Sequence, residues 1–173
     1  MVEAFTVAAV RTADGRRNGG LSGWHPADIA AQVLDALMAH TGFDPALVED
    51  MIMGCVGQID EQAGNIGRSA VLASRLPESV PETSVDRQCG SSQQKLHFAA
   101  QAVMSGSMDV LIAAGVERMS RVPIGTPMSL PAKYGMGFYV SPAITGRGAA
   151  GPRAPHDGAG PRPGNHAGGT GPG

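Results

Sequence analysis

Up to Ala114, hydrophobic positions fall into short runs that alternate with longer stretches of helical periodicity. The short runs at 5–10, 51–56, 83–87 and 110–114 predict four β-strands. Strands that alternate with helices are typical of a mainly parallel sheet covered by helices. The sequence therefore predicts an α/β fold for this region.

The predicted helices are recognised by the residues at their ends. One begins at Pro26 and keeps a 3.6-residue apolar spacing until Gly42. A short one follows Asn65 and stops before Pro77. A third runs from about 91 to 105 and ends at Gly106. Its apolar residues are expected to face the interior: Leu96, Ala99, Ala100, Val103 and Met104.

The chain changes character after residue 118, which gives three predicted regions. Residues 1–118 form the α/β domain, and prolines among Met, Tyr and Phe predict the start of an irregular loop region over 119–145. Residues 146–173 contain ten Gly, five Pro and five Ala and lack the side chains of a core, which predicts a disordered tail. A GC-rich coding sequence read out of frame gives the same composition, so a frameshift is a second hypothesis for this tail.

Charge and composition exclude several kinds of protein. Thirteen basic and 15 acidic residues leave a net charge of −2, so no broad basic surface is expected for nucleic acid. No apolar run reaches the roughly 20 residues of a membrane helix, and a signal peptide is not recognisable. The two cysteines form no CxxC motif, which argues against a disulfide framework or a metal site. We therefore expect a soluble, cytoplasmic protein without metal, nucleic acid or membrane.

Cys89 is the strongest candidate for chemistry. It lies between the strand that ends near Arg87 and the helix that opens near Ser91, where unpaired backbone N–H groups favour a thiolate. Gly90 keeps this turn small, so that an acyl group could approach the sulfur. The alternative is a buried structural cysteine, which is our expectation for Cys55 in the second predicted strand.

The residues around Cys89 resemble the N-terminal half of a thiolase, an acetyl-CoA acyltransferase. The likeness is carried by Val85 to Gln94 and Ala113 to Pro123, with Val10-Arg11-Thr12 and Gly54-Cys55-Val56 in addition, and it extends over residues 1 to about 145. It implies the thiolase N-terminal fold. It also implies that Cys89 is the nucleophile that takes the acyl group from a CoA thioester, a substrate rather than a bound cofactor.

The sequence also departs from the thiolase pattern. Thiolases have a second, similar half with a Gly-His-Pro segment that activates the nucleophile and a Cys-x-Gly segment that moves a proton. No Gly-His-Pro segment occurs here, and the one Cys-x-Gly run, Cys55-Val56-Gly57, lies at the second predicted strand, where a core role is expected. The five histidines offer no replacement. His97 lies about two helical turns beyond Cys89, too far to activate it, His25 and His40 flank the first helix in solvated or capping roles, and the others are His156 and His166.

Three functional hypotheses follow from this resemblance. The first is a thiolase-family acyltransferase that is inactive alone or stops once Cys89 carries the acyl group. The second is a non-catalytic half-thiolase that binds a full-length relative, or a homo-oligomer of the kind that thiolases form. The third is a condensing enzyme similar to ketoacyl synthases, which would depend on a carrier protein. Residues that bind CoA and those that select the acyl chain are not identified by the sequence.

Overall fold

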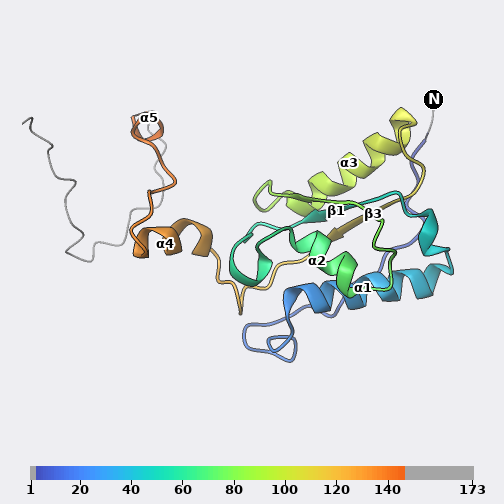
Figure 1. Cartoon of the computed structure of the whole chain (residues 1–173), viewed down its shortest axis with the longest axis horizontal. Coiled ribbons are helices and arrows are strands. Elements are labelled where there is room, and N and C mark those ends of the chain that lie inside the picture. Colours follow the sequence, from blue (N-terminus) through green and yellow to red (C-terminus); the bar gives the residue numbers. More distant parts are fainter. Residues whose placement is uncertain (1–2, 147–173) are drawn as a thin grey trace, which may run out of the picture. The chain divides into compact units, whose positions relative to one another are not determined.

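The computed structural model describes residues 3–146, apart from the side chain of Thr145, and divides the chain into two compact units, Met1–Gly137 and Phe138–Gly173 (Figure 1). The first unit contains every strand found in the described residues. The predicted disordered tail lies outside the described residues except for Gly146. The boundaries at residues 118 and 145 stay predictions.

A three-stranded parallel sheet forms the centre of the first unit. Its strands are β1 (Asp50–Gly54), β2 (Glu82–Val85) and β3 (Leu111–Gly115), arranged in the order β2-β1-β3. Met51 pairs with Glu82 on one side and with Ile112 on the other. Three of the four predicted strands are thereby confirmed, together with the α/β fold.

Two helices cover one face of this sheet. They are α1 (Pro26–Thr41) and α2 (Ile66–Ala73), which lie below the sheet in Figure 1. The predicted ends are confirmed, because Gly42 takes the left-handed φ of 65° after α1 and the Asn65 side chain accepts a hydrogen bond from the N–H of Arg68 at α2. The main core lies on this face and includes Leu34, Met51, Met53, Cys55, Ile66 and Val71.

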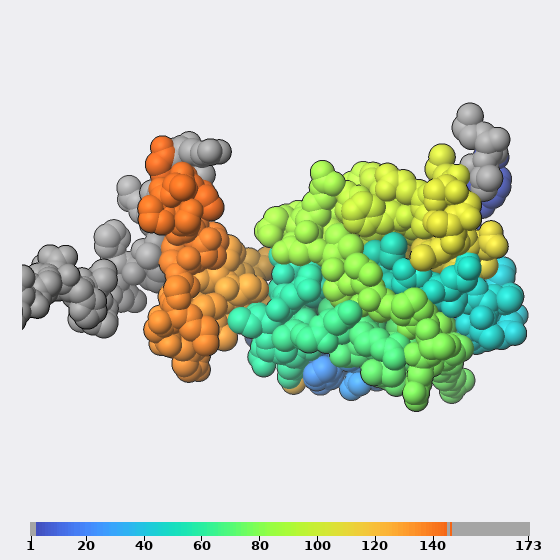
Figure 2. All heavy atoms as spheres, turned by 45° about the horizontal axis from the view of Figure 1, so that its top comes forward, coloured from blue at the N-terminus to red at the C-terminus, as the bar shows by residue number. Residues whose placement is uncertain are grey.

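Helix α3 (Ser91–Ser105) covers the opposite face, above the sheet in Figure 1. Its extent and its end at Gly106 are as predicted, but only some of the apolar residues that were expected to face the interior are buried. Ala99 is buried, whereas Leu96 is 49% and Met104 51% exposed. The prediction is wrong for these two residues because α3 packs mainly against the three strands, and the sheet is too narrow to cover a whole apolar stripe. Figure 2 shows the yellow-green atoms of α3 along an outer face of this unit.

The predicted first strand, residues 5–10, is not a strand in the structure. Phe5 is 78% and Val7 76% exposed. A strand requires a hydrogen-bonded neighbour, and the nearest edge of the sheet, at β3, is not paired with this segment. The apolar sequence of residues 5–10 therefore has the propensity of a strand, but it has no neighbouring strand to pair with.

The predicted irregular region contains more helix than expected. Helix α4 (Thr126–Lys133) begins after Gly125, which takes a left-handed φ of 84°, and it tolerates Pro127 in its first turn. In the second unit, α5 (Pro142–Thr145) forms one turn capped by Ser141. Pro127 and Pro142 were therefore misread as loop residues, because a proline at the start of a helix lacks only an N–H that no helix uses. The remaining short elements are the 3-10 helices η1 (Pro45–Leu47) and η2 (Asp60–Gln62).

Candidate active site

Cys89 lies in a tight turn between β2 and α3. Gln88, next to it, takes a left-handed φ of 50°, which is uncommon for a residue other than glycine. Its N–H donates to Asp86 Oδ1 at 2.7 Å, and the N–H of Gly90 donates to the carbonyl of Arg87 at 3.0 Å. The turn presents Cys89 as an exposed thiol.

The side chain of Ser91 closes this turn from the inside. Ser91 is 4% exposed, and its hydroxyl donates to the carbonyl of Gln88 at 2.6 Å. The same oxygen accepts a hydrogen bond from the N–H of Arg87 at 2.9 Å. One buried hydroxyl therefore joins the residue before the left-handed position to the carbonyl at that position. The sequence does not reveal this role of Ser91, because a hydroxyl that braces a turn has no signature in a single sequence.

Two glycines allow α3 to begin close to the carboxyl ends of the strands. A Cβ on Gly54, at the end of β1, would lie 2.9 Å from the backbone carbon of Ser91. A Cβ on Gly115, at the end of β3, would lie 2.7 Å from Ser92 Oγ. Both distances are shorter than real Cβ contacts allow. The first turn of α3 therefore lies against the carboxyl edge of the parallel sheet, where α/β folds commonly bind ligands.

The two cysteines have opposite surroundings. Cys55 is 1% exposed and follows directly after β1 in the main core. Burial, with a smaller contribution from the charge of Glu117, raises the pKa of the Cys55 thiol to about 12. The expectation of a core role for Cys55 is confirmed, whereas Cys89 is open to solvent.

A polar network, in which Gln62 and Arg118 are buried, connects the region after β3 to the loop after β1. Glu117 accepts hydrogen bonds from the N–H groups of Val56 and Gly57, at 2.8 and 3.2 Å. Gln62 is fully buried, donates to Glu117 at 3.0 Å and accepts from the N–H of Arg118 at 2.6 Å. The Gly-Val-Glu segment, which carries part of the thiolase resemblance, therefore has a structural role, because its carboxylate holds the loop beside Cys55.

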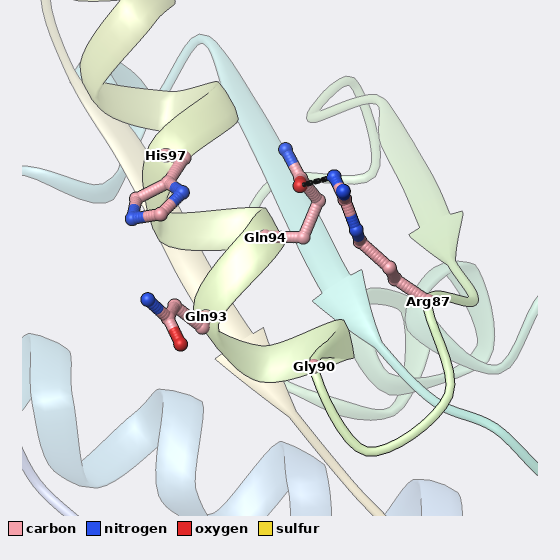
Figure 3. Close-up of a pocket in the computed structure, with 5 residues that line it drawn as sticks. All are labelled: Arg87, Gly90, Gln93, Gln94 and His97. Atoms are coloured by element: carbon pink, nitrogen blue, oxygen red, sulfur yellow. Dashed lines mark hydrogen bonds between the residues drawn. The ribbon is translucent and has the colours of Figure 1, made fainter.

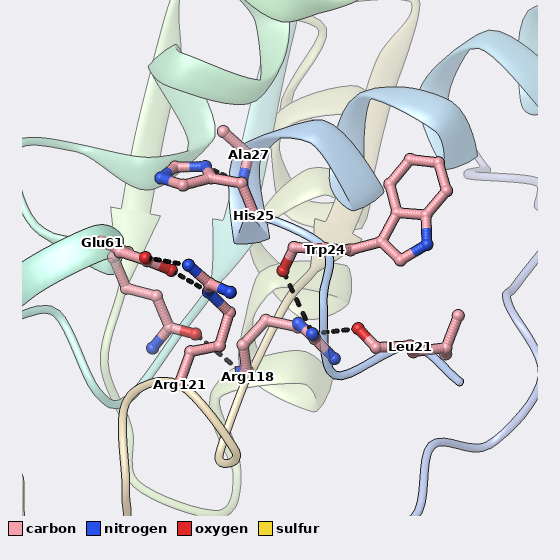
Figure 4. A network of polar contacts seen from close by, with 8 residues as sticks. Leu21, Trp24, His25, Ala27, Glu61, Arg118 and Arg121 are labelled. Atoms are coloured by element: carbon pink, nitrogen blue, oxygen red, sulfur yellow. Dashed lines mark hydrogen bonds and ion pairs between the residues drawn. The ribbon is translucent and has the colours of Figure 1, made fainter. Parts of the chain in front are cut away.

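Arg118 and Arg121 extend this network to the residues before α1 (Figure 4). The guanidinium of Arg118 donates to the carbonyls of Leu21 and Trp24, the second at 3.1 Å. Arg121 forms a two-point ion pair with Glu61, whose pKa it lowers mainly by hydrogen bonding. These basic residues bind backbone and a carboxylate of their own chain, so the structure gives them a role in folding.

A pocket of about 280 Å³ lies along the first two turns of α3 (Figure 3). It is lined by Arg87, Gly90, Gln93, Gln94 and His97. The Arg87 guanidinium donates a hydrogen bond to Gln94 across the pocket. This site is polar and shallow, and Cys89 is not part of its lining.

No histidine in the described part of the chain forms a hydrogen bond with Cys89. The capping role expected for His25 is confirmed, since its Nδ1 accepts from the N–H of Ala27 at 3.2 Å. His40 is exposed in the last turn of α1, and His97 lines the pocket on α3. His156 and His166 lie outside the described residues. Over residues 3–146, no group of three or more His, Cys, Asp or Glu side chains is placed to hold a metal, and no helix could cross a membrane.

Comparison with known proteins gives one consistent result. A family model of the thiolase N-terminal domain matches residues 4–141. The steroid 3-ketoacyl-CoA thiolase FadA6 of Mycobacterium tuberculosis is 51% identical over 135 residues, which cover 78% of this chain and 33% of that protein. The beta-ketoadipyl-CoA thiolase of Escherichia coli is 44% identical over 124 residues, 71% of this chain and 31% of that protein. The chain thus spans about a third of the length of these curated relatives.

Proposed function

The chain belongs to the thiolase family, and from this premise we propose that Cys89 takes an acyl group from a CoA thioester. In this step the Cys89 sulfur, as thiolate, attacks the carbonyl carbon of the thioester. A new bond forms between that carbon and Cys89 Sγ while the bond to the sulfur of CoA breaks. CoA leaves as a thiolate and takes up the proton that Cys89 has lost, so the exchange needs no oxidant or further reactant.

The observation that carries this proposal is the exposed thiol of Cys89 at the amino end of a 15-residue helix. Its sulfur is open to solvent, so the carbonyl carbon of a thioester can approach it. The buried Ser91 hydroxyl bonds to Arg87 and Gln88, and the two glycines let the first turn of α3 lie against the sheet, so the backbone on either side of Cys89 is braced. Cys55 offers no competing nucleophile because it is buried and its pKa is raised to about 12.

We propose acyl transfer to Cys89 as the extent of the reaction for the described residues. A complete thiolase cycle needs a base beside the nucleophile and a stabilised oxyanion. No histidine of residues 3–146 is hydrogen-bonded to Cys89, and the sequence has no Gly-His-Pro segment. The names of the relatives support an acyl-CoA substrate. They do not specify its acyl group, since they include steroid, ketoadipyl and general 3-ketoacyl thiolases.

Intact-protein mass spectrometry after incubation with acetyl-CoA tests this proposal. We expect a mass gain of one acetyl group on the natural chain and on Cys55→Ala, and none on Cys89→Ala. Cys55→Ala is the matched control because it removes the other thiol. No gain on the natural chain, or a gain that persists in Cys89→Ala, contradicts the proposal.

The same experiment separates the condensing-enzyme alternative. If acetyl-CoA gives no adduct and an acetyl-carrier protein does, the chain uses carrier-bound acyl groups as ketoacyl synthases do. Every relative named above is a thiolase, which supports CoA as the carrier.

A half-thiolase that assembles with another thiolase polypeptide is the second candidate function. It is supported by the length of the match, about a third of each relative, and by the apolar side chains that α3 exposes, among them Leu96, Phe98 and Met104. Single apolar residues are common on surfaces, but several on one helix are typical of an interface. Light scattering of the chain alone, and mixed with a full-length relative, measures whether it forms a homo-oligomer or a mixed complex.

A further inference from the structure

A serine and a lysine lie one helical turn apart at the start of α3, in the run Ser92-Gln93-Gln94-Lys95. Residues three apart in a helix are neighbours on one face, so the side chains of Ser92 and Lys95 leave α3 on the same side. Some enzymes that form an acyl-serine have this same spacing, with the serine as nucleophile and the lysine beside it. So short a pattern also occurs by chance, and its meaning depends on its surroundings in the fold.

The two side chains converge at the end of β3. A Cβ on Gly115 would lie 2.7 Å from Ser92 Oγ and 3.4 Å from Lys95 Nζ. The hydroxyl and the amine therefore both occupy the space that the missing side chain of Gly115 leaves open. A hydrogen bond of 3.2 Å from Lys95 Nζ to the carbonyl of Ala113 keeps the amine at this place.

Ser92 has both groups that an attacking serine needs. Its side chain is exposed, and its hydroxyl forms no hydrogen bond within residues 3–146, unlike the buried hydroxyl of Ser91, which braces the turn. The N–H groups of Ser92 and Gln93 likewise have no backbone acceptor in the described part of the chain, as expected in the first turn of a helix. Such free N–H groups stabilise the negative charge that develops on a carbonyl oxygen under attack.

Lys95 has the surroundings of a base. It is half-buried and takes part in none of the ion pairs formed by the described residues. Burial lowers the pKa of Lys95, which favours the neutral amine that accepts a proton. No hydrogen bond joins Lys95 to Ser92 in the structure of the free chain. Contacts of this kind often form only when a substrate is bound.

Both side chains line one groove of the first unit, with a volume of about 1470 Å³. Beyond Lys95, α3 adds a row of apolar side chains to the same lining: Leu96, Ala99, Ala100 and Val103. An apolar lining next to a reactive pair favours a substrate whose acyl group is apolar.

We propose that Ser92 and Lys95 act as nucleophile and base in the cleavage of carboxylic esters with an apolar acyl group. The Lys95 amine takes the proton of the Ser92 hydroxyl while Ser92 Oγ bonds to the carbonyl carbon of the ester. The bond from that carbon to the alcohol oxygen breaks, and the alcohol leaves with the proton from Lys95. Water then attacks the acyl-serine with Lys95 again as base, which releases the carboxylic acid and restores Ser92. This activity goes beyond acyl transfer to Cys89 and does not depend on it.

A fluorophosphonate probe, which bonds covalently to activated serines, tests the pair. The test uses the full chain with Cys89→Ala, so that no reaction at that thiol contributes. We expect peptide mapping to find the label on Ser92, and Ser92→Ala to abolish it. Ser105→Ala, which removes a hydroxyl at the other end of α3, is the matched control and should label at the same rate.

Two substitutions of Lys95 test its role as base. Lys95→Arg keeps a hydrogen-bond donor for Ala113 but does not accept a proton, and Lys95→Met removes both properties. Each should slow labelling of Ser92 by about a hundredfold, the usual contribution of a general base. Circular dichroism checks that each variant is folded. A purely structural role predicts instead that Lys95→Arg labels like the unsubstituted residue.

Ester cleavage is measured in the same Cys89→Ala chain from the release of nitrophenol. p-Nitrophenyl butyrate should be hydrolysed faster than the p-nitrophenyl monoester of succinic acid, and Ser92→Ala should lose this activity. The proposal is overturned if the folded chain takes no label on Ser92, if Lys95→Arg labels at the full rate, or if ester cleavage persists in Ser92→Ala. Because Cys89 is absent throughout, these outcomes are independent of the acetyl-CoA experiment.

Discussion

The two faces of the sheet are covered to very different degrees. On one face α1 and α2 pack against each other and the strands, and six residues of α1 are buried. On the other face α3 is of similar length, yet only Ser91 and Ala99 are buried. Burial therefore follows from what surrounds a helix and not from its apolar content alone. The covered face holds the fold together, and the open face carries Cys89 at its edge.

The largest expected difference between the two faces is in the rates at which Cys55 and Cys89 are alkylated. Cys55 belongs to the covered face, and its pKa of about 12 lies above the ordinary value of 9.0. Only the thiolate reacts with iodoacetamide, so at pH 8 to 9 Cys55 should alkylate about a thousandfold more slowly than an ordinary thiol. Its rate should rise about tenfold per pH unit up to pH 12.

Peptide mapping of the alkylated chain measures the two sites separately. In the native chain at pH 8.5 the label should be found on Cys89, and in denaturant on both cysteines. Rapid labelling of Cys55 without denaturant would mean that the face under α1 and α2 opens easily in solution.

Substituting one leucine on each face compares how much the two faces contribute to the free energy of unfolding. Leu34 on α1 is 1% exposed, and Leu96 on α3 is 49% exposed. Leu34→Ala should lower the free energy of unfolding by about 2–5 kcal/mol, because it leaves a cavity in the main core. Leu96→Ala should change it by less than about 1 kcal/mol. Urea unfolding followed by circular dichroism measures both, and equal losses would show that α3 is covered in solution.

Sequence patterns predicted the elements of both faces because their signals are local. A proline or Asn at a helix start and a glycine at its end act through the backbone of neighbouring residues, as at Asn65, Gly42 and Gly106. Three strands were likewise recognised from short apolar runs. The inward face of α3 and the strand at 5–10 were not predictable, since both depend on a partner that the described residues do not supply.

The candidate site divides in the same way. The position of Cys89 between a strand and a helix could be predicted, because both elements have clear sequence signals. The left-handed turn at Gln88, the brace from Ser91 and the Glu117–Gln62 contact could not. These contacts join residues whose pairing depends on the three-dimensional fold, and a polar residue in a single sequence does not reveal its partner.

Gly54 connects the two faces, since it ends β1 and touches the first turn of α3. A methyl group on Gly54 would meet the backbone of Ser91 and Ser92 at 2.9 and 3.0 Å. Because backbone atoms yield less than side chains, Gly54→Ala should cost about 1–3 kcal/mol of unfolding free energy. Gly23→Ala, where nothing lies within 4 Å, is the control and should be nearly neutral. If Gly54→Ala is neutral as well, α3 is free to move away from the sheet.

Ser91→Ala should act mainly on the reactivity of Cys89. Losing the hydroxyl frees the carbonyl of Gln88 and the N–H of Arg87, so the left-handed turn relaxes. We expect alkylation of Cys89 at pH 7.5 to slow by about tenfold, equivalent to about 1.4 kcal/mol. Ser91→Thr retains the hydroxyl and should restore the rate, and Ser92→Ala should leave it unchanged. A rate that falls equally in all three variants would mean that the helix end as a whole sets the reactivity, because only a specific brace distinguishes one hydroxyl from its neighbour.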